Sequence, residues 1–421
     1  MLSLPSSPRV RRIVLAYTVN RLGTWFGYVA LSIAVFDHTH SALAVAALLV
    51  AGQVLSAFLV PAVVARIEAH PARGGLAALY VFETVATVAL ALVIMLAFSL
   101  PVVLALVALD GTAALAASAL LRTAAARSAR ESAYADGGVV DDDALESAAL
   151  EAERVANAAL NIGFATTFTL GPAIAGLIVP AFGAPAALFI DAATFLLCGA
   201  LLLDLIPHVE EAETSSVRER VAAAWRYIGE ARALRHLLAA EGVALVFFTF
   251  SGPVEVAYAK ASLHAGDGGY GLLVGVWGLG VTIGSIVFAR SLERSPRVLL
   301  SLSTLAVGLA YVGWSAAPSL ALASCAGLIG GIGNGVQWAS LISAVQRLTP
   351  QPLHGRLMGA VESLGAICPA IGFSLGGAIT VLSSPREAFL VAGVGASLST
   401  IAFLRMPRGE LAPALASSTS G

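Results

Sequence analysis

The stretch GRLMGAVESLGAICPAIG, residues 355–372, decides the fold because it sets an arginine, a glutamate, a proline and four glycines in an otherwise apolar run. Charges and helix breakers inside an apolar helix are expensive in hydrocarbon, and they are tolerated where helices pack closely or move. Apolar residues continue to position 382. We interpret the stretch as the start of a membrane-spanning helix, with Gly355 and Arg356 at its cytoplasmic boundary.

The whole chain has the composition of a membrane protein. Its 421 residues are 58% hydrophobic and 12% charged, with a mean hydropathy of +0.86, whereas soluble domains carry about 25% charged residues. A helix that crosses the hydrocarbon core needs roughly 20 apolar residues. Twelve windows of about this length are present, at 13–36, 43–65, 75–97, 101–121, 157–180, 185–206, 236–258, 269–289, 298–317, 319–343, 357–382 and 387–404. The sequence therefore predicts an all-α polytopic protein with twelve transmembrane helices.

The positions of the basic residues predict the orientation. Nearly all of the 24 lysines and arginines fall in segments on the same side as the N-terminus, and loops rich in these residues stay in the cytoplasm. Only Lys260 and Arg386 lie in loops on the other side. We expect both termini to be cytoplasmic. Cys198, Cys325 and Cys368 lie inside predicted spans without paired spacing, so neither a disulfide nor a metal site is predicted.

The chain divides into two halves that resemble each other. A hydrophilic segment with an amphipathic helical pattern separates six spans from six, which predicts three parts: 1–206, 207–235 and 236–421. ARIEAHPAR (65–73) corresponds in position to ARSLERSPR (289–297), and LGPAIAG (170–176) corresponds to ICPAIGF (367–373). Such matches indicate internal duplication, a common plan of secondary transporters.

A second hydrophilic segment, 122–156, is expected to be a cytoplasmic connection. Asp141, Asp142 and Asp143 stand there where a helix would begin, and acidic residues are favourable at that end of a helix dipole. Their spacing does not fit a calcium loop.

Three motifs resemble the major facilitator superfamily, in its branch of bacterial exporters related to the enterobactin exporter. They are HGRLMG (354–359) with Pro369, ANAALN (156–161) leading to GPAIAG (171–176), and GYGLLVGVWGLGVTIGSI (269–286). The resemblance implies two six-helix pseudo-repeats and alternating-access transport. It also implies a location in the bacterial inner membrane, a monomer, and a small molecule, protons and lipid as partners. The charged residues form no dense basic patch, so no nucleic-acid partner is predicted.

The resemblance also implies gating residues. These are Arg66, Arg290, Arg356, Gly171, Pro172 and Pro369. Glu362 joins the gating candidates because it lies only about 8 Å inside the cytoplasmic boundary, a depth suited to an inner-gate contact. The loop between the second and third spans departs from the family pattern, because Pro61 and Ala65 stand where glycine and aspartate are usual. In the family, charge pairs of this loop help to hold one conformation of the transporter. Here these pairs are expected to be weaker or to use other charged residues.

Seven charged residues lie inside predicted spans, where charge is costly and often functional. They are Arg21, Glu83, Asp110, Asp191, Glu241, Glu255 and Glu362. The rise per residue places Arg21 and Asp110 at similar depths, and we predict them as the proton-coupling pair with Glu83 as the competing partner of Arg21. A permanent ion pair that only fixes helix packing is an equally weighted alternative.

Aromatic and amide side chains in the spans are the candidates for the substrate cavity. They are Asn20, Trp25, Phe247, Glu255, Asn334, Gln337 and Trp338. Aromatic groups with a few polar ones suit an amphipathic organic molecule, although Asn334 and Gln337 could equally bond neighbouring helices.

No phosphate loop, catalytic triad or zinc-protease spacing occurs, so neither an enzyme nor a cofactor is predicted. The leading hypothesis is proton-coupled export of a drug, siderophore or secondary metabolite. An importer or facilitator on the same fold and a non-transporting membrane sensor are the alternatives.

Overall fold

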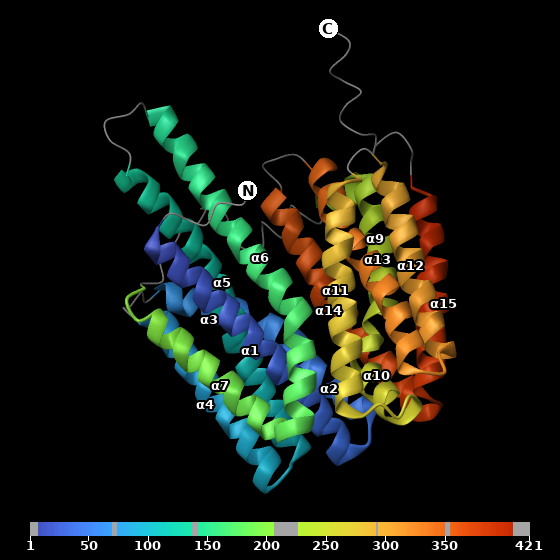
Figure 1. Ribbon diagram of the computed structural model, residues 1–421. Coiled ribbons are helices and arrows are strands. Elements are labelled where there is room, and N and C mark those ends of the chain that lie inside the picture. Colours follow the sequence, from blue (N-terminus) through green and yellow to red (C-terminus); the bar gives the residue numbers. More distant parts are fainter. Residues whose placement is uncertain are drawn as a thin grey trace. The chain divides into compact units, whose positions relative to one another are not determined.

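A computed structural model of the protein describes residues 7–69, 74–136, 142–205, 226–291, 294–349 and 354–406. Within these ranges the chain is almost entirely helical and contains no strand (Figure 1). Ten helices in the described ranges are long and apolar enough to cross a membrane. The protein is therefore an all-α, multi-pass membrane protein.

The chain folds into two compact units. The first comprises Met1–Ala34 and Ala51–Glu211, and the second comprises Val35–Val50 and Ala212–Gly421. The helices that lie wholly or mainly in the first unit are α1 (Pro8–Thr39), η1 (Val50–Leu55), α3 (Ser56–Ala69), α4 (Gly75–Leu96), α5 (Leu100–Asp136), α6 (Asp142–Phe182) and α7 (Ala184–Leu201). Here α4 packs against α5 and α7, and α5 packs against α3 and α6.

The second unit contains the remaining helices. They are α2 (Ala42–Leu49), α9 (Arg232–Thr249), α10 (Ser251–Ala257), η2 (Tyr258–Ser262), α11 (Gly266–Ala289), α12 (Pro296–Ala316), α13 (Leu320–Arg347), α14 (His354–Leu382) and α15 (Pro385–Leu404). In this unit α13 packs between α11 and α12, and α12 also packs against α15. Helix α2, although early in the sequence, packs against α10 and α14 and so belongs to this unit.

Local sequence signals set several helix ends. Ser41, Ser319 and Ser384 precede α2, α13 and α15, and the hydroxyl of each accepts a hydrogen bond from a backbone N–H of the first turn. This is the usual N-cap role of serine. Gly74 precedes α4 with a φ of 79°, a left-handed conformation that glycine adopts without strain.

Glycines bring α11 and α13 into backbone contact. A Cβ added to Gly280 would lie 2.5 Å from the Leu328 carbonyl oxygen and 2.8 Å from the Cα of Gly331. Gly284 and Gly335, each one turn further along, are in the same kind of contact. Two small-xxx-small pairs therefore face each other, the arrangement that lets transmembrane helices approach closely.

The hydrophilic segment 122–156 differs from the expected connection. Helix α5 continues through it to Asp136, and α6 starts again at Asp142. Alanine and charged residues that favour helices fill the segment, and ion pairs such as Arg127 with Glu131 stabilise it. The predicted helix start at the three aspartates is confirmed by the start of α6.

Two predictions on domain organisation remain open. The boundaries 1–206, 207–235 and 236–421 stay a prediction, and most of the proposed amphipathic linker, at 207–225, lies outside the described residues. The predicted windows 13–36 and 357–382 correspond to α1 and α14. Neither belongs to the ten helices that meet the length and hydropathy criteria within the described ranges.

Candidate functional site

Arg21 lies on α1 in the interior of the first unit. Its Nη2 donates a hydrogen bond to Ser118 Oγ on α5 at 3.3 Å. The guanidinium carbon also lies 5.4 Å from the ring centroid of Tyr17 and 5.6 Å from that of Phe164. Within the described part of the chain, no carboxylate comes within ion-pair distance of Arg21. The direct contacts of the cation are therefore with a hydroxyl and with aromatic faces.

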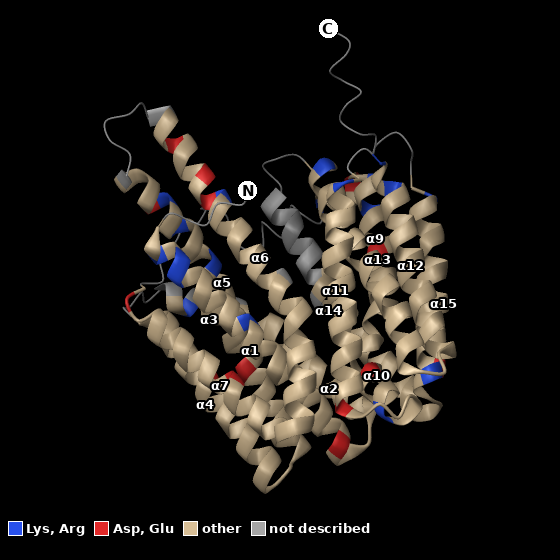
Figure 2. Cartoon of the chain, viewed as in Figure 1, with Lys and Arg blue, Asp and Glu red and all other residues tan. Residues whose placement is uncertain are grey.

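Glu83 on α4 is the most deeply buried of the predicted coupling residues. It is 0% exposed, and neither carboxylate oxygen has a hydrogen-bond partner among the described residues. Its carboxylate interacts electrostatically with Asp110, Asp191 and Arg21. Glu83 thus lies in a group of four charged side chains carried by α1, α4, α5 and α7, while most other charges lie toward helix ends (Figure 2).

Asp110 and Asp191 complete this group. Asp110 on α5 accepts a hydrogen bond from Thr87 Oγ1 at 3.3 Å. Asp191 on α7 is 4% exposed, and its Oδ1 has no partner among the described residues. A Cβ added to Gly23 of α1 would lie 2.5 Å from that oxygen, and one added to Gly27 would meet the other carboxylate oxygen. These two glycines therefore make room for a carboxylate.

The structure bears on the choice of partner for Arg21. An electrostatic interaction of Arg21 is present with Glu83, whereas the direct side-chain contact of Asp110 is with Thr87. Neither acid forms an ion pair with Arg21 in the described part. Asp191 is the member of the group that sequence reasoning did not place in a site. The spacing Gly23-x-x-x-Gly27 on α1 was the available signal, because small residues mark close helix contacts.

The predicted cavity residues of the first unit lie near this group. Asn20, one residue before Arg21, is buried. The Trp25 ring contacts the Phe168 ring of α6 at 5.0 Å and the Tyr28 ring at 5.6 Å between centroids. A Cβ on Gly171 of α6 would lie 2.7 Å from Trp25 Cβ. Gly171 therefore lets Trp25 pack directly on the α6 backbone.

The predicted cavity residues of the second unit do not form one group. Gln337 on α13 donates hydrogen bonds to both oxygens of Glu241 on α9, at 3.4 and 3.2 Å. Gln337 therefore bonds a neighbouring helix, one of the two roles that the sequence left open. Asn334 is partly buried, and Trp338 is 51% exposed.

Two further members of the predicted cavity set lie on α9 and α10. Phe247 contacts the Phe250 ring at 5.7 Å and packs over Gly395 of α15. Glu255 is buried within α10, whose residues are all buried.

A large aromatic cluster in the second unit was not predicted. Tyr311 lies 5.5 Å from Trp277, 5.7 Å from Trp314 and 5.5 Å from Phe389 between ring centroids. Trp314 Nε1 donates to the Ala323 carbonyl at 2.7 Å, and Tyr258 OH donates to the Trp314 carbonyl at 2.5 Å. These buried, satisfied polar groups indicate a packing role.

The predicted gating residues lie at helix ends and inside two helices. Arg66 is exposed in the last turn of α3, and Arg290 is exposed at the end of α11. Pro172 in α6 and Pro369 in α14 are buried within their helices. Arg356 and Glu362 belong to α14, but their side chains lie outside the described residues, so their gating roles stay predictions.

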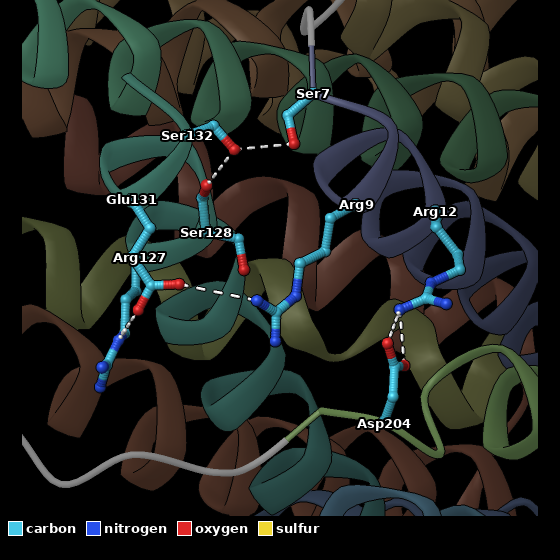
Figure 3. Close-up of polar contacts among 8 residues, drawn as sticks. All are labelled: Ser7, Arg9, Arg12, Arg127, Ser128, Glu131, Ser132 and Asp204. Carbon is cyan, nitrogen blue, oxygen red and sulfur yellow. Dashed lines mark hydrogen bonds and ion pairs between the residues drawn. The ribbon is translucent and has the colours of Figure 1, made fainter. Parts of the chain in front are cut away.

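Ion pairs hold together the helix ends that we predict to be cytoplasmic (Figure 3). Arg12 on α1 donates to both oxygens of Asp204 at 2.5 Å. Glu131 on α5 pairs with Arg127 at 2.5 Å and with Arg9 at 3.6 Å. The Arg12 hydrogen bonds lower the pKa of the Asp204 carboxyl. Each of these three arginines forms an ion pair, whereas Arg21 forms none with the described residues.

Comparison with known proteins identifies the fold. Residues 237–419 match the sequence model of the Major Facilitator Superfamily. No curated protein sequence matches the chain. The crystal structure of the nucleoside transporter NupG is similar over 95% of this chain and 99% of its own, with a TM-score of 0.72 and 11% identity.

Two other solved structures are similar over most of their length. A POT family transporter in complex with 5-aminolevulinic acid covers 94% of this chain and 95% of its own, with a TM-score of 0.70 and 13% identity. A bacterial homologue of the iron transporter ferroportin, in an inward-facing state, covers 94% and 98%, with a TM-score of 0.67 and 18% identity. The chain therefore has the major facilitator fold, and residues 237–419 in its second half also match that superfamily in sequence.

Proposed function

We propose that the protein is a secondary transporter that couples proton movement to the export of an amphipathic small molecule by alternating access. The observation that carries the proposal is Glu83, a fully buried glutamate whose two oxygens lack hydrogen-bond partners in the described part of the chain. A charged carboxylate in that setting would be very costly, and the protonated group avoids most of the cost. Such a residue is suited to gain and lose a proton as solvent access changes.

The surroundings of Glu83 support coupling over a purely structural role. Asp110 and Asp191 repel a charge on Glu83, whereas Arg21 attracts it. Because Arg21 has no carboxylate within ion-pair distance in the described residues, the group is not closed by a permanent salt bridge. Protonation of Glu83 would therefore remove its attraction to Arg21 and its repulsion by Asp110 and Asp191. We propose Glu83 and Asp110 as the proton-binding residues and Arg21 as the cation that responds to them.

Export by the enterobactin-exporter branch remains a proposal that rests on the sequence motifs. The same fold also serves import and facilitated diffusion, so direction must be measured. Purified protein reconstituted into vesicles, with the pH gradient imposed in either direction, tests both points. If flux of fluorescent amphipathic probes ignores the gradient and Asp110→Asn transports normally, proton coupling is wrong. If probes accumulate only in the direction of proton flow, the protein is an importer.

A further inference from the structure

One face of α1 carries a row of two aromatic side chains and one arginine. Tyr17, Arg21 and Trp25 are four residues apart and so follow one another along the same side of the helix. Opposite them, Phe164 and Phe168 have the same spacing on α6. The two rows are in contact, because Arg21 lies over the Phe164 ring and Trp25 lies edge-on to the Phe168 ring.

A second arginine adds to the positive charge of this row. Arg122 on α5 lies 5.2 Å from the centroid of the Tyr17 ring, and its Nη2 donates to Tyr17 OH at 2.7 Å. Arg21 lies 5.4 Å from the same ring. Both guanidinium groups therefore contact the same aromatic ring, which brings two positive charges to one part of the first unit.

Neither arginine forms an ion pair in the described part of the chain. Among the described residues, no carboxylate lies within ion-pair distance of Arg21 or Arg122, whereas Arg12 and Arg127 each have one. The Nε of Arg21 is also buried and has no hydrogen-bond acceptor in the described part. Glu83 interacts with Arg21 electrostatically but does not bond to it. The row therefore has a buried N–H donor without an acceptor, and two guanidinium groups without an ion pair, among the described residues.

Aromatic rings with partly exposed faces lie next to Arg21. Phe164 is 39% exposed, and its ring lies 5.8 Å from that of Phe168. Phe168, Trp25 and Arg21 are partly buried and therefore only partly covered by the chain. A flat apolar group could stack on these rings while a carboxylate attached to it reaches the guanidinium of Arg21. Arginine is the residue best suited to such a carboxylate because its fork donates two parallel hydrogen bonds.

We propose that Arg21, reinforced by Arg122, binds the carboxylate of an organic anion whose aromatic or apolar body contacts Phe164 and Phe168. The protein would thus act on amphipathic acids and not on amphipathic cations. That the bound acid is transported rests on the proposed function above. The binding itself does not, and it can be tested without any flux.

The test compares 2-naphthoate with its neutral isostere 2-naphthamide. Calorimetric titration of the full-length protein in phosphatidylcholine nanodiscs gives both dissociation constants. We expect wild type to bind naphthoate at least about tenfold more tightly than the amide, the effect of one charge-assisted hydrogen bond. Equal affinities in wild type would overturn the proposal without recourse to any variant.

Variants then assign the preference to its residues. Arg21→Gln should abolish the difference between the two compounds, Arg21→Lys should retain part of it, and Arg122→Gln should reduce it. Arg127→Gln, which removes a surface arginine paired with Glu131, is the matched control and should keep the full difference. A preference that survives Arg21→Gln in protein of normal elution and helicity would contradict the assignment.

Some lipid headgroups are also anions and could bind the two arginines. The titration is therefore repeated in nanodiscs that contain phosphatidylglycerol. Naphthoate binding should persist there. Its loss would mean that the arginines bind a lipid phosphate instead, which overturns the proposal. If naphthoate shows the predicted preference but no probe responds to a pH gradient, the transport proposal fails and the anion site stands. If only cationic probes move with protons, proton-coupled transport stands and the anion-site proposal fails.

Discussion

Gln337 on α13 donates its amide N–H to the carboxylate of Glu241 on α9, with Nε2 lying 3.2 Å from Oε2. Both side chains are buried, at 6% and 4% exposure. The two residues are 96 positions apart in the chain, so this contact joins helices that no local signal connects. In an apolar interior such a bond contributes chiefly because an unpaired carboxylate is costly.

Removal of the amide should therefore destabilise the protein more than removal of both partners. Gln337→Leu leaves Glu241 without its donor and should lower the free energy of unfolding by about 1–3 kcal/mol. Glu241→Leu combined with Gln337→Leu should recover part of that loss. Thermal unfolding of detergent-solubilised single and double variants measures the coupling. Additive losses would show that the bond contributes nothing.

The contact between α11 and α13 should not tolerate a methyl group at Gly280. Alanine there would place Cβ 2.5 Å from the Leu328 carbonyl oxygen, so the helices would have to move apart. We expect Gly280→Ala to cost about 1–3 kcal/mol, as overpacking does. Gly365→Ala is the control, because no atom of the described residues lies within 4 Å of a Cβ at that position. Equal melting temperatures of the two variants would refute the tight contact.

The pair of Arg12 and Asp204 predicts a pH-dependent stability. The Arg12 hydrogen bonds lower the pKa of Asp204 in the folded protein, so the pair stabilises the fold at pH values above the ordinary aspartate pKa of about 4. The stabilisation is lost as the pH falls through the lowered pKa. Asp204→Asn should therefore melt slightly below wild type at pH 7, and the difference should vanish in acid.

The solvent exposure of the two side chains sets the expected size of the effect, and it also guides the choice of the control variant. The Arg12 and Asp204 side chains are 36% and 58% exposed, so solvent screening keeps the effect small. Glu151→Gln alters a more exposed pair with Arg154 and should not change the melting temperature at any pH. A constant difference between wild type and Asp204→Asn down to strongly acidic pH would contradict the account.

Much of the fold follows from the sequence because it depends on length and hydrophobicity. The apolar windows correspond to helices, and Pro296 and Pro385 lie in the first turns of α12 and α15, where proline fits. The helical extension of α5 was missed because its charged residues suggested a connection. Helix propensity outweighs polarity in that segment, where Arg127 and Glu131 form an ion pair.

The candidate site was less predictable. The sequence identified Arg21, Glu83 and Asp110 because charge within an apolar window stands out. It could not show that Asp191 lies against Gly23, or that Arg122 shares the Tyr17 ring with Arg21, since these contacts depend on how α1, α5 and α7 pack. The grouping of α2 with the second unit is likewise a matter of packing.

The most direct test of proton coupling is the response of transport to a pH gradient in Glu83→Gln. Reconstituted wild type, Glu83→Gln and the surface control Glu131→Gln would be compared by the ratio of probe flux with and without the gradient. The account predicts a ratio well above one for wild type and Glu131→Gln, and a ratio of about one for Glu83→Gln with flux retained. An undiminished ratio in Glu83→Gln would contradict it.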